Sequence, residues 1–374
     1  MARINSNISF HSHFHYSRSR LSIFRAKFLL LTYLILTFGC SNQQKEDLVS
    51  NQKIPEKELR PELPLFSRIL SHQSGIRFQN KIVENAIHNS MYYDYMYNGG
   101  GVAISDFNND GLQDVYFTGN FADNRLYLNK GGLKFEDISE RAGVLAKGTW
   151  SSGVTIVDIN ADGFDDIYVC RSYWSRNPDL YKNLLYINNG DLTFTEQAAN
   201  YGIDDGGHSS QATFFDYDKD GDLDLYVANH PVDFHPADPN LRSDKWKSPP
   251  MEDSDHLYRN NGDGSFSDVT KQAGVLGYGF GLGVVVADFN QDGWPDLYVA
   301  NDFEHPDCYF VNNQNGSFTN QINSAFKHIS TFGMGVDAAD INNDGLLDLM
   351  ELDMQSEDNF RQKTMMASMN PERF

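Results

Sequence analysis

The chain has 374 residues, 40% of them hydrophobic and 22% charged, so it can bury a substantial core and is not a disordered tail. Its formal net charge of −21 argues against a nucleic-acid-binding surface, because phosphate would be repelled. Three cysteines exclude a dense disulfide scaffold, and a 13% share of aromatic residues favours a β-rich protein.

Residues 1–39 are expected to be an export signal, because they hold no Asp or Glu and five basic residues. The uncharged apolar run at 28–38 is too short to cross a membrane as a helix. It ends in a glycine followed by Cys40, which resembles the lipid-attachment site of bacterial lipoproteins; an ordinary secretory signal beside a chance cysteine is the alternative. We therefore expect an exported chain, anchored to a bacterial outer membrane only through lipidated Cys40, with 40–64 as a polar tether.

A nine-residue acidic motif, Asp-x-Asn/Asp-x-Asp-Gly-x-x-Asp, occurs five times in the rest of the chain. Its copies start 52, 58, 72 and 52 residues apart, which indicates a constant unit with inserted loops of different length. The expected repeats lie near residues 98–147, 148–207, 208–279, 280–331 and, in partial form, 332–374.

Each complete unit also holds four short runs of β-branched and aromatic residues, which predict four antiparallel strands. In the first unit these runs are 101–104, 115–117, 125–129 and 134–138. Four strands in roughly 50–60 residues are typical of a β-propeller blade. A string of separate calcium-binding β modules is less favoured, because a lone four-stranded sheet cannot bury both faces. Residues 75–80 resemble a lone fourth strand.

The run Tyr-Asn-Gly-Gly-Gly-Val-Ala-Ile-Ser-Asp-Phe-Asn-Asn-Asp-Gly at 97–111 resembles bacterial VCBS-repeat proteins related to the CRTAC/ASPIC-UnbV group. More broadly, the repeats resemble the FG-GAP/VCBS blades of integrin α-subunits, over residues 65–374. The resemblance implies an all-β protein, a β-propeller of four-stranded blades. The fifth unit shows only a first strand, an acidic loop and a short apolar run, so we expect an incomplete propeller.

The acidic motifs predict about five calcium sites, one in each loop between the first and second strands. Calcium takes six to eight oxygen ligands, and positions 1, 3, 5 and 9 supply side-chain oxygens while position 7 supplies a carbonyl. Position 6 is always glycine, which tolerates the sharp turn. The expected ligands are Asp106, Asn108, Asp110, Leu112, Asp114; Asp158, Asn160, Asp162, Phe164, Asp166; Asp216, Asp218, Asp220, Asp222, Asp224; Asp288, Asn290, Asp292, Trp294, Asp296; and Asp340, Asn342, Asp344, Leu346, Asp348.

The loops have two other possible interpretations. An EF-hand requires Glu at position 12 and flanking helices, whereas only Glu351 meets the first condition and the flanks are strands. Asx turns without a metal are the second alternative. The third loop is expected to bind calcium most tightly, because only it carries Asp218 at position 3 and Asp222 at position 7.

The face opposite the acidic loops is expected to carry the long insertions, and with them any ligand. Its aromatic and histidine side chains are candidates for gripping an extracellular protein or a glycan; the alternative is that they plug the channel or pack between blades. The candidates are Trp150, Trp174, His208, Tyr278, Phe280, His305 and Phe332.

The function expected from these features is a calcium-stabilised ligand-binding or adhesion scaffold on the cell surface. No catalytic residue is assigned, because motifs for nucleophilic, metallopeptidase or phosphate-loop chemistry are absent from the sequence. A carbohydrate-active enzyme such as a polysaccharide lyase, or an accessory subunit, remains the alternative.

Overall fold

The computed structural model describes residues 66–90, 93–172, 177–231, 250–302, 305–354, 358 and 360. The chain divides into two units, Met1–Ser67 and Arg68–Phe374, and the fold described below belongs to the second. The expected signal, the tether with Cys40, and Trp174 lie outside the described residues. Within the described ranges, no helix is both long enough and apolar enough to cross a membrane.

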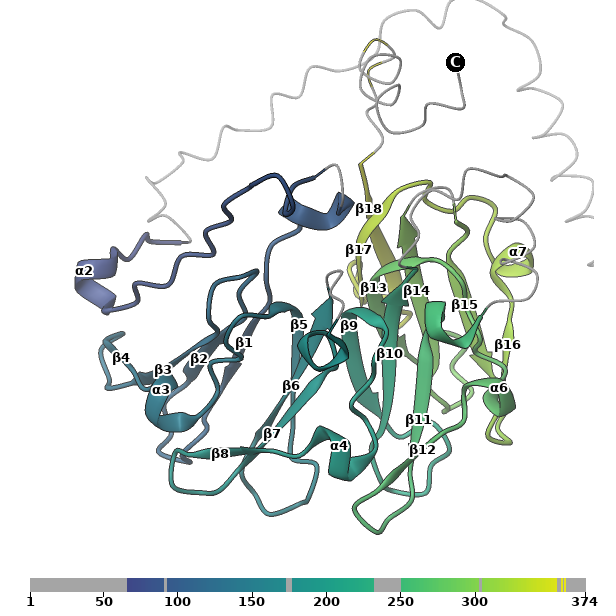
Figure 1. The fold of residues 1–374 in the computed structure, drawn as a ribbon. Coiled ribbons are helices and arrows are strands. Elements are labelled where there is room, and N and C mark those ends of the chain that lie inside the picture. The colour runs from purple at the N-terminus through teal and green to yellow at the C-terminus, as the bar shows by residue number, and fades with distance from the viewer. Residues whose placement is uncertain are drawn as a thin grey trace, which may run out of the picture. The chain divides into compact units, whose positions relative to one another are not determined.

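Four sheets of four antiparallel strands follow one another along the chain, each with its strands in sequence order (Figure 1). The all-β fold and its blade architecture are therefore confirmed. The strands are β1 (Val102–Ser105), β2 (Asp114–Phe117), β3 (Arg125–Asn129) and β4 (Phe135–Asp137); β5 (Trp150–Val157), β6 (Asp166–Ser172), β7 (Leu184–Asn188) and β8 (Phe194–Glu196); β9 (His208–Phe215), β10 (Asp224–His230), β11 (His256–Asn260) and β12 (Phe266–Asp268); and β13 (Phe280–Ala287), β14 (Asp296–Asp302), β15 (Cys308–Asn312) and β16 (Phe318–Asn320).

A fifth sheet has two strands, β17 (Gly333–Ala339) and β18 (Asp348–Asp353), as expected for the partial unit. The first strands β1, β5, β9, β13 and β17 lie side by side in that order, so successive sheets adjoin through their first strands (Figure 1).

The hydrophobic core lies between neighbouring sheets rather than inside any one of them. On the second strands, alternate residues point to opposite faces. Tyr226 of β10 packs toward the following sheet, against Leu297 and Val299 of β14. Its neighbours Leu225 and Val227 pack toward the preceding sheet. The second, third and fourth blades therefore bury both faces, which an isolated module could not do, whereas Val102 and Ile104 on the other face of the first blade are 58% and 61% exposed.

Each complete blade is also held by the tyrosine of its second strand. The hydroxyl of Tyr226 donates to Oδ2 of Asp255 at 2.8 Å, and Oδ1 of Asp255 accepts the backbone N–H of Asn229 at 2.8 Å. A polar residue just before the third strand bonds to this tyrosine in every complete blade: Asp255 and Asp307 accept from the hydroxyl, whereas Asn124 and Asn183 donate to it through Nδ2. The corresponding pairs are Tyr116 with Asn124, Tyr168 with Asn183, and Tyr298 with Asp307.

The structure differs from the expected elements in two places. Residues 75–80 form no strand: they follow the short helix α2 (Ser71–Ser74), and there the ring of Phe78 stacks on Phe117 of β2. One-turn helices after the fourth strands were not predicted, because four residues are too few to show a helical period. They are α3 (Ser139–Ala142), α4 (Ala198–Tyr201), α6 (Thr270–Ala273) and α7 (Ile322–Ala325).

Candidate metal centre

All five acidic motifs lie in the connection between the first and second strand of a sheet, as the sequence predicted. Their backbones share a common turn. The position-6 glycine has a positive φ in each loop, from 85° at Gly111 to 99° at Gly221. Position 4 is also left-handed in each loop, which the sequence pattern did not reveal; these residues are Asn109, Ala161, Lys219, Gln291 and Asn343.

The position-1 carboxylate organises the loop by accepting backbone N–H groups. In the first loop Asp106 Oδ1 accepts the N–H of Asp110 at 3.0 Å, and Asp106 Oδ2 accepts that of Gly111 at 2.7 Å. The second, fourth and fifth loops repeat both bonds. These bonds hold the turn without a metal, and each carboxylate oxygen keeps a further lone pair that can face a cation.

The position-9 carboxylate is the buried member of the first four loops. Asp114 is fully buried; its Oδ2 accepts the N–H of Phe107 and its Oδ1 that of Asn129, at the end of β3. Burial raises the pKa of this carboxyl, and the two N–H bonds only partly oppose the shift. In the third loop, burial and neighbouring carboxylates raise the pKa of Asp224 to about 7, against the lowering effect of its own N–H bonds. Such a group lacks a compensating positive charge.

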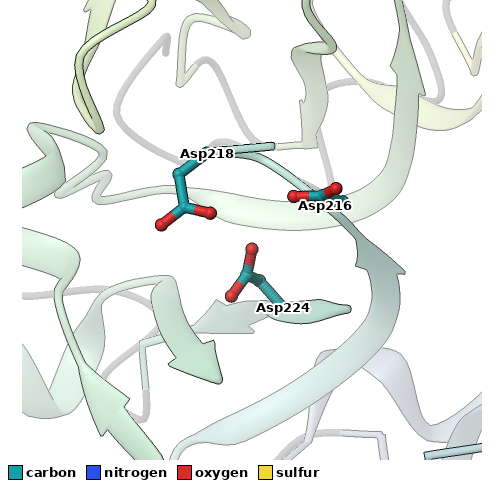
Figure 2. A group of neighbouring side chains, drawn as sticks. All are labelled: Asp216, Asp218 and Asp224. Atoms are coloured by element: carbon teal, nitrogen blue, oxygen red, sulfur yellow. The ribbon is translucent and has the colours of Figure 1, made fainter. Parts of the chain in front are cut away.

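The third loop brings three carboxylates together. One oxygen from each of Asp216, Asp218 and Asp224 lies within 4.8 Å of the others, and Figure 2 shows the three carboxylates surrounding a common space. This is the single group of three or more acidic, histidine or cysteine ligands found among the described residues. Asp216 Oδ1 is buried and accepts no hydrogen bond from any described residue, whereas its counterpart Asp106 Oδ1 is bonded.

These features fit a hard divalent cation. The ligands are all oxygen, which suits calcium or magnesium rather than zinc or copper. The buried, unpartnered Asp216 Oδ1 is the atom that a bound cation would satisfy. The other four loops carry Asn at position 3. In the first, second and fifth loops, the Nδ2 of this asparagine donates to the position-5 carboxylate. There the carboxylates are less closely gathered.

The aromatic and histidine side chains expected to bind a ligand are buried. Trp150, His208, Tyr278, Phe280, His305 and Phe332 are each no more than 8% exposed. Residues 93–97, here called the strap, pack on several of them. Tyr93 contacts the Trp150 ring edge-on, and Tyr95 contacts Phe280. This arrangement gives these side chains a packing role, and their ligand-binding role stays a prediction.

Two sets of residues that support these sites were not identified from the sequence. The first is the asparagine that ends each third strand, whose N–H holds the position-9 carboxylate; its signal was the repeated Asn after an apolar run. The set is Asn129, Asn188, Asn260 and Asn312. The second is the strap, where Tyr95 also donates to Asp302 Oδ2 at 3.2 Å. No repeat pattern marks the strap, because it precedes the first repeat.

Parts of this chain are similar to known proteins. Mouse cartilage acidic protein 1 is 28% identical over 247 residues, covering 60% of this chain and 35% of the relative, and the human protein is 27% identical, with 60% and 34% covered. The chain therefore spans about a third of the length of these curated relatives. A solved structure of an Agrocybe aegerita lectin, described as recognising non-reducing terminal N-acetylglucosamine, aligns with a TM-score of 0.39 at 19% identity, over 67% of this chain and 60% of that chain.

The family comparison is more extensive. The FG-GAP-like repeat matches residues 106–169, 173–227, 250–299 and 288–350, which together make up more than half of the chain. Every acidic loop lies wholly or partly within these matches, and so do the second strands that follow the loops. The chain belongs to the FG-GAP-like repeat family.

Proposed function

We propose that this FG-GAP β-propeller is a calcium-stabilised scaffold, exported and anchored through Cys40, that binds an extracellular protein or glycan. The observation that supports calcium most directly is the third loop, where Asp216, Asp218 and Asp224 surround a common space and Asp216 Oδ1 is buried without a partner. Calcium would neutralise carboxylates that otherwise repel one another, and would thereby favour the folded blade.

A ligand-binding role is supported by the scaffold itself. The second strands run away from the acidic loops, so the connections that follow them begin at the opposite end of the sheets, on a rigid set of blades. The metal loops and the ligand-bearing loops are then separate, and calcium acts on binding through the rigidity of the blades.

Thermal denaturation of the mature chain tests the calcium proposal. A ligand at 1,000 times its Kd stabilises the native state by about 4 kcal/mol, so millimolar calcium should raise Tm above the value in EDTA by several degrees. Magnesium at equal concentration is the matched control for ionic strength, and should do less, because it prefers a smaller octahedral cage. Equal melting temperatures in calcium and in EDTA would reject the proposal.

A binding screen against extracellular proteins and glycans, with calcium and with EDTA, tests the scaffold role. Binding should be retained in calcium and fall in EDTA. Anchoring is tested separately by Cys40→Ala, which should leave the precursor unlipidated. Membrane association and processing that are unchanged in this variant would contradict the lipoprotein assignment.

A further inference from the structure

Side chains at position 4 of one acidic loop contact the following loop. Asn109 of the first loop donates from Nδ2 to the carbonyl oxygen of Gly163 in the second loop, at 2.8 Å. Gln291 of the fourth loop donates from Nε2 to the carbonyl oxygen of Gly345 in the fifth, at 2.9 Å. In both cases the acceptor is the position-6 glycine, so the same contact recurs in two separate pairs of blades.

The two remaining steps between loops differ. Lys219 of the third loop places its ammonium group 4.8 Å from the ring centroid of Trp294, at position 7 of the fourth loop, which is a cation–π contact. Ala161 of the second loop has no polar atom in its side chain with which to reach the third loop. Position 4 thus links the first loop to the second and the fourth to the fifth by hydrogen bonds, and leaves the second and third unlinked.

Both ends of each hydrogen bond lie between expected calcium ligands. Asn109 stands between Asn108 and Asp110, so the first loop's turn fixes where its amide points. Gly163 donates its own N–H to Asp158 Oδ2 at 2.9 Å and precedes Phe164, whose carbonyl is an expected ligand. Ordering either loop therefore favours the ordered position of the other.

We propose that position-4 amides couple calcium binding in pairs, so that calcium in the first loop raises the affinity of the second, and calcium in the fourth raises that of the fifth. The second and third loops have no such coupling. This inference rests on the proposed calcium binding. Asn109 and Gln291 are positioning residues, since they act through the neighbouring loop rather than by touching the ion.

The expected coupling is modest. Both bonds are solvent-exposed, which places them at the weak end of protein hydrogen bonds, so we expect a change in affinity of about two- to fivefold, or about 0.4–1 kcal/mol. Repulsion between neighbouring ions opposes the coupling and acts whether or not the amide is present. By thermodynamic linkage, the second loop must raise the affinity of the first by the same factor.

Calcium titration of the full mature chain, followed by the NMR signals of the position-6 glycine amides, measures each loop separately. Each of these N–H groups donates to the position-1 carboxylate of its own loop, so its chemical shift reports that loop's occupancy. Asp110→Ala empties the first loop, which the loss of the Gly111 response verifies. Asp110→Ala should also weaken calcium binding in the second loop, read at Gly163. This weakening should be about two- to fivefold larger when Asn109 is present than in the Asn109→Gly background.

Glycine is the matched replacement at position 109, because it removes the donor and accepts the left-handed backbone without strain. The converse change is Ala161→Asn, which should create coupling between the second and third loops, read at Gly221 when Asp162→Ala empties the second loop. Ala161→Gly is its control and should create none.

The outcomes separate the two proposals. Glycine amides that respond to calcium while Asp110→Ala has the same effect in both backgrounds would overturn the coupling and leave calcium binding intact. Five amides that do not respond to calcium would overturn the proposed function, and the coupling with it.

Discussion

Asp218→Asn should have opposite effects on the stability of this protein with and without calcium. The substitution gives the third loop the position-3 residue that the other four carry. It removes one charge from three carboxylates whose oxygens lie within 4.8 Å of one another. Burial and the charge of Asp220 already raise the pKa of Asp218, which indicates that its ionised form is disfavoured when no cation is bound.

The size of the effect follows from these distances. Two unit charges 4.8 Å apart repel by about 1 kcal/mol in bulk water and by roughly 3 kcal/mol at an effective dielectric constant of 20. Asp218 is half-buried, so we expect the variant to be about 1 kcal/mol more stable in EDTA, which corresponds to a rise in Tm of about 2 °C. The loss in calcium-binding free energy should be larger than this gain, because the ion carries two charges and lies closer to the carboxylate. Its affinity at this loop should fall about tenfold to a hundredfold, or about 1.4–2.8 kcal/mol.

Two measurements on the same samples decide the matter. Calorimetric titration should show the tightest calcium phase weakened in Asp218→Asn, and thermal denaturation in EDTA should show the small gain. The matched control is Asn108→Asp in the first loop, which should strengthen binding there and lower Tm in EDTA. If the tightest phase survives Asp218→Asn unchanged, carboxylate count does not set the ranking of the loops, and the packing of the blades must do so.

Three further predictions concern the scaffold. Tyr226→Phe should lower the free energy of unfolding in urea by about 1–3 kcal/mol, because it removes a donor from the buried Asp255; an unchanged midpoint would mean that the bond contributes nothing. Gly221→Ala should lower the free energy of unfolding in urea by about 1 kcal/mol, because φ is 99° there, even though a Cβ would meet no atom within 4 Å. Gly335→Ala is the control and should lower it much less, because Gly335 also has open space but no positive φ. Burial opposes the charge on His256, but the Asp205 carboxylate outweighs burial and raises the pKa of His256 to about 9. The stability that this pair contributes is therefore complete below pH 6.5 and is lost as pH rises through 9, so Tm should fall over that range. His256→Gln should abolish that fall.

The blades could be predicted from sequence because the same pattern occurs in every unit. Glycine at position 6 of each loop, such as Gly111, predicted the sharp turn, and the turn has a positive φ each time. The aromatic and β-branched runs predicted strands, and the strands occupy those runs. A single run of four apolar residues fits a strand or a buried helix equally well, and the recurrence of four such runs in every unit favoured strands.

Features outside the repeated pattern could not be predicted in the same way. The strap places Tyr93 and Tyr95 against residues of distant strands, and this depends on long-range packing that no local spacing encodes. The aromatic side chains predicted at the ligand face are buried for the same reason. An aromatic residue in a loop looks the same in sequence whether it faces solvent or a neighbouring strand.

Departures of one repeat from the others give individual blades of this chain their own chemistry. Glu351 of β18 corresponds to valine in the preceding three second strands, and its Oε2 accepts the Tyr298 hydroxyl at 3.1 Å. Burial, followed by the charge of Asp307, raises the pKa of Glu351 to about 7, so at this position the last sheet contacts its neighbour through a titratable group, beside the apolar contacts of Val336 and Leu349. Asp218 and Ala161 are departures of the same kind in the acidic loops, one adding a charge and the other removing a contact. The positions at which the repeats agree define the loops, so any difference between loops in the proposed calcium affinity or coupling must arise at the positions where they disagree.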